Sequence, residues 1–366
     1  MDTTVPEIRF DEQGTCQFCE IHDILDARYP LGEEGERQLA VLVDEIKASG
    51  RGRDYDCVVG TSGGRDSTWT MYTAKKLGLR PLAVHFDNGW NSETAVTNIR
   101  NATEKLGTDL ETYVADWEEF KDIQIAFLRA SVPDVEVPTD LAIHSVLHYY
   151  AAKEGIRYIL NGHSFRTEGV APRGWTYFDG RYINAIQSRF GTRKLHDFKN
   201  FGINELLYYS FWKGIKVIPI LNYRPYHQQE ITDLLTREVG WTYYGGHHHE
   251  SYYTKFIQSY LLPKKFNIDK RRTEFSALIR SGQMTRNEAL EYLSTHAYEY
   301  DEALEEYAVS KLGLSRAEWA EIYATPPKSY LDYPSYYPLM RASKSIIRWL
   351  SDREILPKLL YLKYLG

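Results

Sequence analysis

The feature that most constrains this chain is a short glycine-containing loop between a predicted strand and a predicted helix. The strand covers residues 55–60, and Ser62-Gly63-Gly64-Arg65-Asp66-Ser67 follows, with helical spacing from Asp66 onward. Two glycines allow a tight turn that brings backbone N–H groups close to an anion, and the helix N-terminus adds partial positive charge. We therefore predict that the six residues of this loop bind the pyrophosphate part of ATP.

Asp66 needs a separate explanation, because a carboxylate repels phosphate. A Mg²⁺ ion between Asp66 and the phosphates would remove this repulsion, so we predict that Asp66 is a magnesium ligand and a catalytic residue. The loop is not a Walker loop, because no Lys-Ser or Lys-Thr pair follows the glycines. The simpler alternative is a Ser-Gly-Gly turn that only joins a strand to a helix.

The order of apolar segments predicts an α/β fold with a doubly wound, mostly parallel sheet and helices on both faces. The predicted strands cover residues 55–60, 81–86, 110–115, 156–160 and 216–221. The predicted helices cover residues 34–49, 66–77, 92–106, 117–130 and 139–154, with Ser92 as a helix cap. Residues 162–200 show no clear periodicity, which is typical of a long loop such as a substrate lid.

The pattern changes to charged helices after residue 245, with predicted helices at 252–262, 276–280, 285–298 and 317–324. We therefore divide the chain into an N-terminal segment (1–30), a nucleotide-binding domain (31–245) and a helical C-terminal region (246–366).

The composition of the chain limits the classes of function that it can have. The net charge of −6 and the pI near 6.0 provide no general positive field for a nucleic acid. No run of 18 apolar residues occurs, so we predict no membrane span. Three cysteines and no charged-then-apolar leader at the N-terminus indicate a cytoplasmic protein without a disulfide framework.

Two further strand ends carry polar residues at the edge where nucleotides bind in open α/β sheets. His85 and Asp87 lie at the end of the second strand, and Gly162 and His163 follow a later one. We predict that these four residues contact ATP. For the second strand, a simple turn at residues 88–89 is the alternative.

The S-G-G-x-D-S loop after a first strand resembles the PP-loop ATP pyrophosphatases, which have the adenine nucleotide alpha hydrolase (HUP-like) fold. More of the chain is similar to one family among them, the N-acetyl sugar amidotransferases of surface-polysaccharide synthesis. The similar segments are 8–19, the loop itself, 84–90 (Val-His-Phe-Asp-Asn-Gly-Trp), 161–169 (Asn-Gly-His-Ser-Phe-Arg-Thr-Glu-Gly), 244–251 (Tyr-Gly-Gly-His-His-His-Glu-Ser), 254–256, 262–266 and 269–272.

The resemblance implies conversion of an acetamido group on a nucleotide-linked sugar to an acetamidino group, as in lipopolysaccharide O-antigen synthesis. Adenylation of the amide oxygen would give an O-adenylyl imidate, from which ammonia displaces AMP, so that ATP yields AMP and pyrophosphate. Cys57 lies within a predicted apolar strand and is a poor glutaminase nucleophile. A separate glutaminase partner that supplies ammonia is therefore expected.

The same resemblance suggests further site residues outside the loop. Lys255, Arg271 and Glu250 are expected to be catalytic, and Glu168, His248 and Arg272 to bind the substrate. Lys and Arg suit phosphate or a sugar carboxylate by charge. A solvated charged face is the alternative for the basic residues, and a polar turn for His248.

Cys16 and Cys19 have the C-x-x-C spacing of zinc sites, but two thiolates make only half of a tetrahedral site. His22 or a histidine at 247–249 would have to complete it. Relatives commonly carry another Cys pair ahead of the position of Met1. A structural zinc ion and two reduced surface thiols both stay open.

Two other functions also stay open. A tRNA-modifying PP-loop ligase would activate a base carbonyl by the same adenylation, although the acidic charge of the chain opposes this. The second alternative is a scaffold that binds a nucleotide without catalysis, although an intact Asp66 opposes this. The sequence also leaves open whether the chain forms a homo-oligomer.

Overall fold

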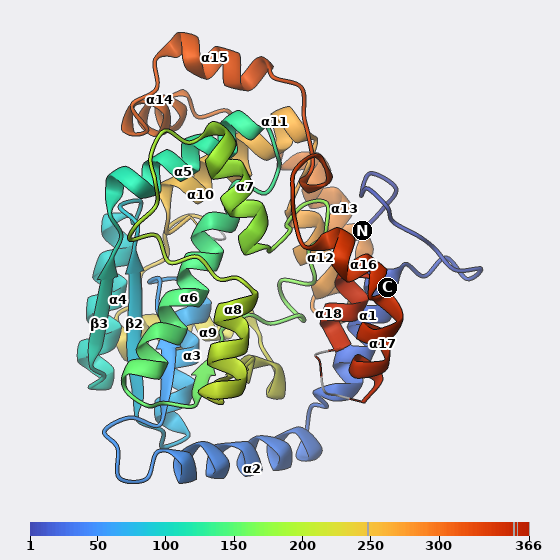
Figure 1. The fold of residues 1–366 in the computed structure, drawn as a ribbon. Coiled ribbons are helices and arrows are strands. Elements are labelled where there is room, and N and C mark those ends of the chain that lie inside the picture. Colours follow the sequence, from blue (N-terminus) through green and yellow to red (C-terminus); the bar gives the residue numbers. More distant parts are fainter. Residues whose placement is uncertain (247–248, 354–355, 357, 366) are drawn as a thin grey trace.

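The computed structural model describes residues 1–246, 249–353, 356 and 358–365. Its centre is a five-stranded sheet in the order β3-β2-β1-β4-β5, and all four strand pairs are parallel. Strands β2 and β3 are labelled in Figure 1. The strands are β1 (Cys57–Gly60), β2 (Pro81–Asp87), β3 (Leu110–Val114), β4 (Tyr158–Leu160) and β5 (Lys216–Ile218). The predicted α/β fold is confirmed. No helix in the described ranges is long and apolar enough to cross a membrane.

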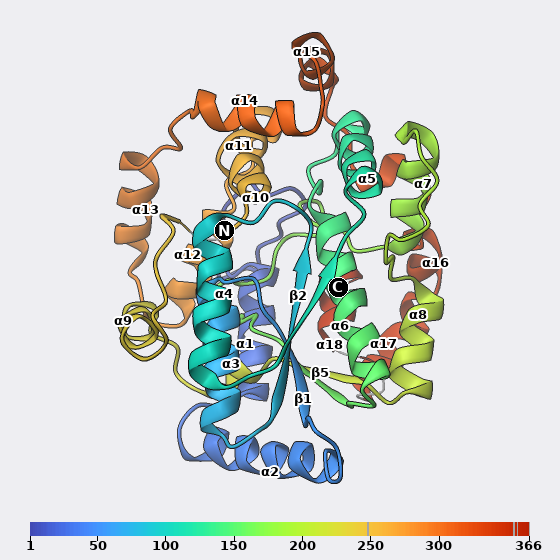
Figure 2. The ribbon, with the colours of Figure 1, turned by 90° about the vertical axis from the view of Figure 1, so that its left-hand side faces the viewer.

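Helices cover both faces of the sheet (Figure 2). Neighbouring residues of β1 point to opposite faces, so Val59 packs in one hydrophobic cluster and Val58 in the other. The Val59 side is covered by α2 (Glu33–Ser49), α3 (Arg65–Lys76), α4 (Glu93–Leu106) and α9 (Gln228–Val239). The Val58 side is covered by α5 (Trp117–Ala130) and α6 (Val137–Lys153), and α7 (Gly180–Phe190) packs against α5.

The first three strand-helix units agree closely with the prediction because their boundaries carry local signals. The Ser92 side chain accepts a hydrogen bond from the Ala95 N–H (3.1 Å) and caps α4, as expected. Asp116 caps α5 through the Glu119 N–H in the same way. The predicted strand at 216–221 is shorter, because Pro219 cannot donate to the ladder and a 3₁₀ turn, η2 (Ile220–Tyr223), follows.

The predicted loop at 162–200 is wrong in its middle, where α7 forms. Asp179 caps this helix, and Tyr182, Ile183 and Ile186 are fully buried in the main core. The stretch after α7 is fastened to α5: a carboxylate oxygen of Glu119 accepts hydrogen bonds from three successive backbone N–H groups, those of residues 196–198. This part of the segment is therefore held in place in the structure.

The described part of the C-terminal region is helical, as predicted. Its first helical stretch comprises α10 (Tyr252–Phe256), the π-helical turn η3 (Ile257–Leu261) and α11 (Leu262–Phe266). Tyr253 and Phe256 belong to the same core as Trp90, whose ring centroid is 5.2 Å from that of Tyr253. This region thus shares its core with the sheet domain, and the three-part division stays a prediction.

The remaining elements lie around this core. They are α1 (Gln17–Arg28), α8 (Ile203–Leu207), η1 (Tyr208–Trp212), α12 (Arg271–Arg280), α13 (Arg286–Thr295), α14 (Glu302–Lys311), α15 (Arg316–Ala324), η4 (Tyr330–Asp332), α16 (Tyr337–Ala342), α17 (Lys344–Asp352) and α18 (Lys358–Tyr364).

Candidate functional site

The glycine loop lies between β1 and α3, and buried side chains hold its backbone in place. Gly63 has φ +77°, and a Cβ atom there would lie 2.3 Å from the Ala95 carbonyl oxygen, so only glycine fits. The Gly63 carbonyl oxygen accepts hydrogen bonds from Asn98 Nδ2 (3.1 Å) and Trp241 Nε1 (3.0 Å). Asn98 and Trp241 are almost fully buried, which gives the loop a rigid support.

The hydroxyl groups of the loop hold one another in position. Ser67 Oγ accepts a hydrogen bond from the Ser62 N–H (3.2 Å), and it donates to the Gly64 carbonyl oxygen at 3.1 Å. The two serine hydroxyls are 3.3 Å apart. They therefore lie beside the N-terminus of α3, where a phosphate group could receive donors from hydroxyls and backbone together.

Glu250 reaches the glycine loop from the C-terminal region. Its Oε1 accepts a hydrogen bond from Ser62 Oγ at 3.3 Å, and the residue is only 9% exposed. A Cβ atom at Gly64 would lie 2.9 Å from this Oε1, so the second glycine of the loop makes room for the carboxylate. The Ser92 N–H donates to the Glu250 carbonyl oxygen (2.8 Å), which fixes the backbone beside β2. Glu250, predicted only from resemblance, is thus brought to the loop.

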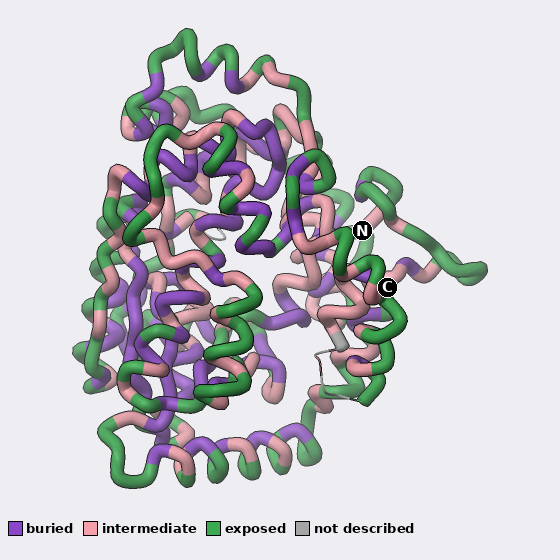
Figure 3. Tube along the Cα trace, viewed as in Figure 1, coloured by how far each residue is buried: buried purple, intermediate pink, exposed green. Residues whose placement is uncertain are grey.

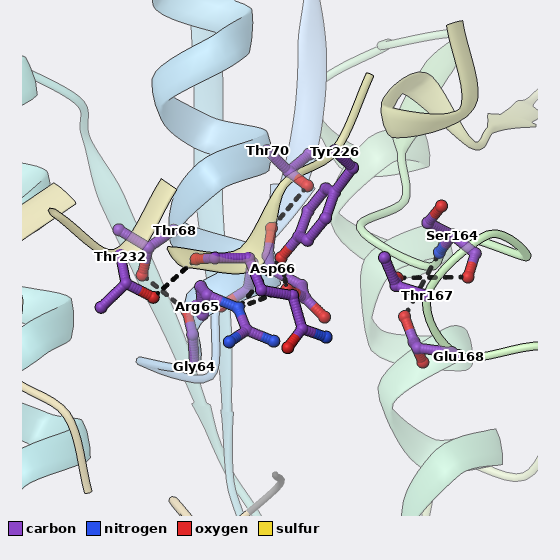
Figure 4. Close-up of polar contacts among 12 residues, drawn as sticks. Gly64, Arg65, Asp66, Thr68, Thr70, Ser164, Thr167, Glu168, Tyr226 and Thr232 are labelled. Carbon is purple, nitrogen blue, oxygen red and sulfur yellow. Dashed lines mark hydrogen bonds and ion pairs between the residues drawn. The ribbon is translucent and has the colours of Figure 1, made fainter. Parts of the chain in front are cut away.

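The Asp66 carboxylate is held by two side chains (Figure 4). Its Oδ1 accepts a hydrogen bond from the Tyr226 hydroxyl and lies 3.4 Å from Arg65 Nε. Arg65 Nε also donates to the Tyr226 hydroxyl at 3.1 Å. Burial raises the pKa of Tyr226, and the charge of Asp66 raises it further, so the phenol stays neutral. Tyr226 was missed in the sequence, because it follows η2 in a stretch without a motif.

A second buried tyrosine, Tyr244, lies beside Gly64 and Glu250. A Cβ atom at Gly64 would be 3.2 Å from its hydroxyl. Burial raises the pKa of Tyr244, and the charge of Glu250 adds to this effect. Tyr244 is therefore a neutral donor at the loop.

The arrangement could hold a magnesium ion. Glu250 accepts from Ser62, Asp66 lies in the first turn of α3, and the charges of both carboxylates act on Tyr244, so both can supply the hard oxygen ligands that Mg²⁺ prefers. Within the described ranges, no group of three or more His, Cys, Asp or Glu side chains forms a complete metal site. One or two carboxylates completed by substrate phosphates and water are common for Mg²⁺, so these residues fit the ion.

Three predicted residues, Gly162, His163 and Glu168, lie in the loop that follows strand β4. A Cβ atom at Gly162 would lie 2.9 Å from Thr70 Oγ1 and 3.1 Å from the Asp66 carbonyl oxygen, so this loop touches the start of α3. His163 Nδ1 is 2.9 Å from Glu168 Oε2. Desolvation lowers the pKa of His163, but the Glu168 carboxylate outweighs it and the net shift is upward. His163 and Glu168 thus form an ion pair when the imidazole is protonated.

His85 and Asp87 shape the end of β2. His85 is 7% exposed, and its Nδ1 is 2.8 Å from the Thr61 carbonyl oxygen, which can only accept, so Nδ1 carries the proton. Its Nε2 then accepts from Asn91 Nδ2 (3.1 Å), which also donates to Asp87 Oδ1. Desolvation lowers the pKa of His85 and keeps it neutral. Contact of either residue with ATP stays a prediction.

Each basic residue predicted from resemblance is paired with a carboxylate that lies outside the glycine loop. Lys255 Nζ is 3.6 Å from Asp301 Oδ2, and Arg271 forms a 2.6 Å ion pair with Asp269. Arg272 pairs with Asp2. Their catalytic or substrate-binding roles stay predictions. His247 and His248 lie outside the described residues.

The cysteine pair lies at the start of α1. Cys16 Sγ and Cys19 Sγ are 3.6 Å apart, close to the separation of about 3.8 Å expected for two thiolates on a tetrahedral zinc ion with Zn–S bonds of about 2.3 Å. His22 lines the same cavity, but its Nε2 lies 3.3 Å from Ser281 Oγ. No third metal-binding side chain joins the cysteines in the described part of the chain. Zinc therefore stays a prediction that rests on these two thiols.

Comparison with known proteins finds a family model that matches part of the C-terminal region. Residues 250–346 match the family model for the C-terminal domain of WbpG-like lipopolysaccharide biosynthesis proteins. The predicted resemblance to surface-polysaccharide enzymes is confirmed for this segment, which begins at Glu250. No curated protein sequence matches the chain.

Three solved structures show weak likeness to the chain. NMN synthetase from Francisella tularensis has 13% identity and a TM-score of 0.32, and covers 77% of this chain and 96% of its own. The NH3-dependent NAD synthetase from Campylobacter jejuni has 13% identity and a TM-score of 0.31, and covers 74% and 99%. A predicted tRNA methyltransferase subunit from Methanocaldococcus jannaschii has 17% identity and a TM-score of 0.27, and covers 49% and 75%. At these TM-scores the likeness carries no argument about the site.

Proposed function

We propose that this chain is an ATP-dependent ligase that converts the acetamido group of a nucleotide-linked N-acetyl sugar to an acetamidino group in lipopolysaccharide biosynthesis. One observation carries the proposal. Glu250, the first residue of the segment that matches the lipopolysaccharide family, contacts Ser62 of the glycine loop. The loop that is proposed to bind ATP and the segment that matches the lipopolysaccharide family therefore touch each other.

The proposed reaction has two steps that balance. The amide oxygen of the substrate attacks the α-phosphorus of ATP, the bond between that phosphorus and the bridging oxygen breaks, and pyrophosphate leaves. Ammonia then attacks the carbon of the O-adenylyl imidate, the carbon–oxygen bond breaks, AMP leaves and the nitrogen loses a proton. Adenylation is needed because the oxygen of an amide is otherwise a poor leaving group.

The residues of the loop would bind and orient the triphosphate. The Ser62 and Ser67 hydroxyls and the N-terminus of α3 provide donors for the leaving pyrophosphate. Asp66 and Glu250 would hold Mg²⁺, which when bound supplies positive charge that offsets the charge of the phosphates. Desolvation lowers the pKa of His163, but the Glu168 carboxylate raises it by more, so the protonated imidazole is favoured over that of a free histidine at this edge of the sheet.

A separate glutaminase is proposed as the source of ammonia, because Cys57 cannot serve as a nucleophile in the folded protein. The Cys57 thiol is fully buried in β1, and burial raises its pKa, so the thiolate is disfavoured.

Product analysis tests this proposal. The purified chain would be incubated with ATP, isotopically labelled ammonium and a panel of nucleotide-linked N-acetyl sugars, and the products examined by mass spectrometry. We expect one sugar to gain the labelled nitrogen in an amount equal to the AMP formed. AMP formation without label in any sugar would reject the assignment of the substrate class, and formation of ADP would reject the ligase chemistry itself.

A further inference from the structure

An exposed apolar surface lies on α8, η1 and β5, away from the glycine loop. We call it the α8–β5 surface. Figure 3 shows much of this stretch as exposed. Seven large apolar side chains with exposed fractions between 37% and 82% form it: Ile203, Leu206, Leu207, Tyr208, Phe211, Trp212 and Val217.

The inner side of the same segment packs against the rest of the protein. The Tyr209 ring centroid is 5.3 Å from that of His148 on α6 and 6.1 Å from that of Phe201. Ile215 is buried just before β5. Glu205 is the only charged residue in 203–212. Large apolar side chains that cluster on one side of a helix are normally covered in a folded protein, so the outer side of this segment lacks its cover.

The exposed area is large enough for a stable dimer. Weighted by their exposed fractions, the seven side chains leave on the order of 800 Å² uncovered, taking up to about 250 Å² for a fully exposed aromatic side chain and less for an aliphatic one. Apolar patches on monomers rarely exceed about 600 Å², and a standard interface buries about 800 Å² per partner.

The surface continues onto an open sheet edge. Strand β5 is the last strand of the sheet, and β4 is its sole strand partner among the described residues. Lys216 and Val217 on this strand are exposed. The open edge of such a strand is a ready template for pairing with another chain.

We propose that the α8–β5 surface binds a second copy of this chain around a two-fold axis. A two-fold contact buries the same patch on both copies, so the roughly 800 Å² that each copy offers matches the area per partner of a standard interface. The open edges of two β5 strands can also pair antiparallel about such an axis.

This inference does not depend on the proposed function. Strand β5 is separated from β1 by β4, and the glycine loop follows β1. A dimer formed through the α8–β5 surface therefore leaves the nucleotide site of each copy open, and variants of the surface can be checked for unchanged ATP turnover.

Sedimentation of the full chain over a range of concentrations is the test. We expect a species of twice the 42.6 kDa chain mass. Phe211→Glu combined with Trp212→Glu should give a monomer with unchanged thermal stability. Leu290→Glu is the matched control, because Leu290 is 50% exposed on α13, outside the surface, and its substitution should leave the dimer intact. A monomer at every concentration, or a dimer that survives the double substitution, would overturn the inference.

Discussion

Glu250 Oε1 lies 3.3 Å from Ser62 Oγ, although 188 residues separate the two in the chain. This contact joins the glycine loop to the segment that matches lipopolysaccharide biosynthesis proteins. The Glu250 carboxylate lies where the phosphates are proposed to bind, and a negative charge there would be repulsive without a cation. A metal-holding role explains its position better than a structural one.

We expect Glu250→Gln to lower the rate of AMP formation by about 10–100-fold, because the amide keeps the hydrogen bond with Ser62 and loses the charge. The fold should be retained, since the Ser92 N–H bonds to the backbone of residue 250. Ser251→Ala is the matched control: it removes the cap of α10, costs about 1 kcal/mol of stability and should leave the rate unchanged. Equal rates for Glu250→Gln and wild type would show that the carboxylate only fills space.

Asp66→Asn should abolish adenylation while the melting temperature stays the same. Asp66 lies in the first turn of α3, after the N-cap Gly64, so a purely structural role predicts only the loss of a helix-dipole interaction, about 1 kcal/mol or less. Loss of a metal ligand predicts a fall in pyrophosphate release of about 10³-fold or more, equivalent to at least about 4 kcal/mol at the transition state. Near wild-type AMP formation in saturating Mg²⁺ would move the assignment to Asp87, which should be tested next.

Tyr226→Phe should weaken metal binding without abolishing chemistry. The Tyr226 hydroxyl donates to Asp66 Oδ1 and orients the carboxylate, and loss of such a supporting hydrogen bond typically costs about 10–100-fold in metal affinity. Mn²⁺ binding measured by electron paramagnetic resonance gives this directly, and the rate should recover at high Mg²⁺. Tyr243→Phe is the control, because Tyr243 is 59% exposed. Unchanged Mn²⁺ affinity in Tyr226→Phe would remove Tyr226 from the site.

The His163–Glu168 pair predicts a pH dependence. The folded pKa of His163 is raised above its ordinary value of 6.5, so the folded protein binds the proton more tightly than the unfolded chain. The contribution of this pair to stability is therefore fully present below pH 6.5 and is lost as pH rises through the higher folded value. The side chain is 44% exposed, so the effect is small. NMR titration should show a lower His163 pKa in Glu168→Gln, and an unchanged pKa would contradict the pairing.

Local signals explain what the sequence could predict. The strand, the glycines and the helix start at residues 57–67 are neighbours in the chain, so the loop and the parallel sheet follow from short-range patterns. Helix α7 was missed although Tyr182, Ile183 and Ile186 have helical spacing, because glycine and arginine at its start suggest a loop.

Long-range packing explains what the sequence could not predict. Trp241 and Tyr226 lie in irregular segments more than 150 residues after the loop, and only the folded chain brings them to Gly63 and Asp66. Glu250 was found through family resemblance, since no local pattern around it indicates contact with the loop. The partner of Arg272 was equally hidden, because Asp2 lies 270 residues away in the chain, whereas the partner of Arg271 is its neighbour Asp269.

The most direct test of the central claim follows the amide oxygen. A nucleotide-linked N-acetyl sugar carrying oxygen-18 in its acetamido carbonyl would be incubated with the protein, ATP and ammonium, and the released nucleotide analysed by mass spectrometry. Adenylation of the amide predicts that the label appears in the phosphate of AMP, in an amount equal to the amidine formed. Label in water or inorganic phosphate, with unlabelled nucleotide, would contradict the account.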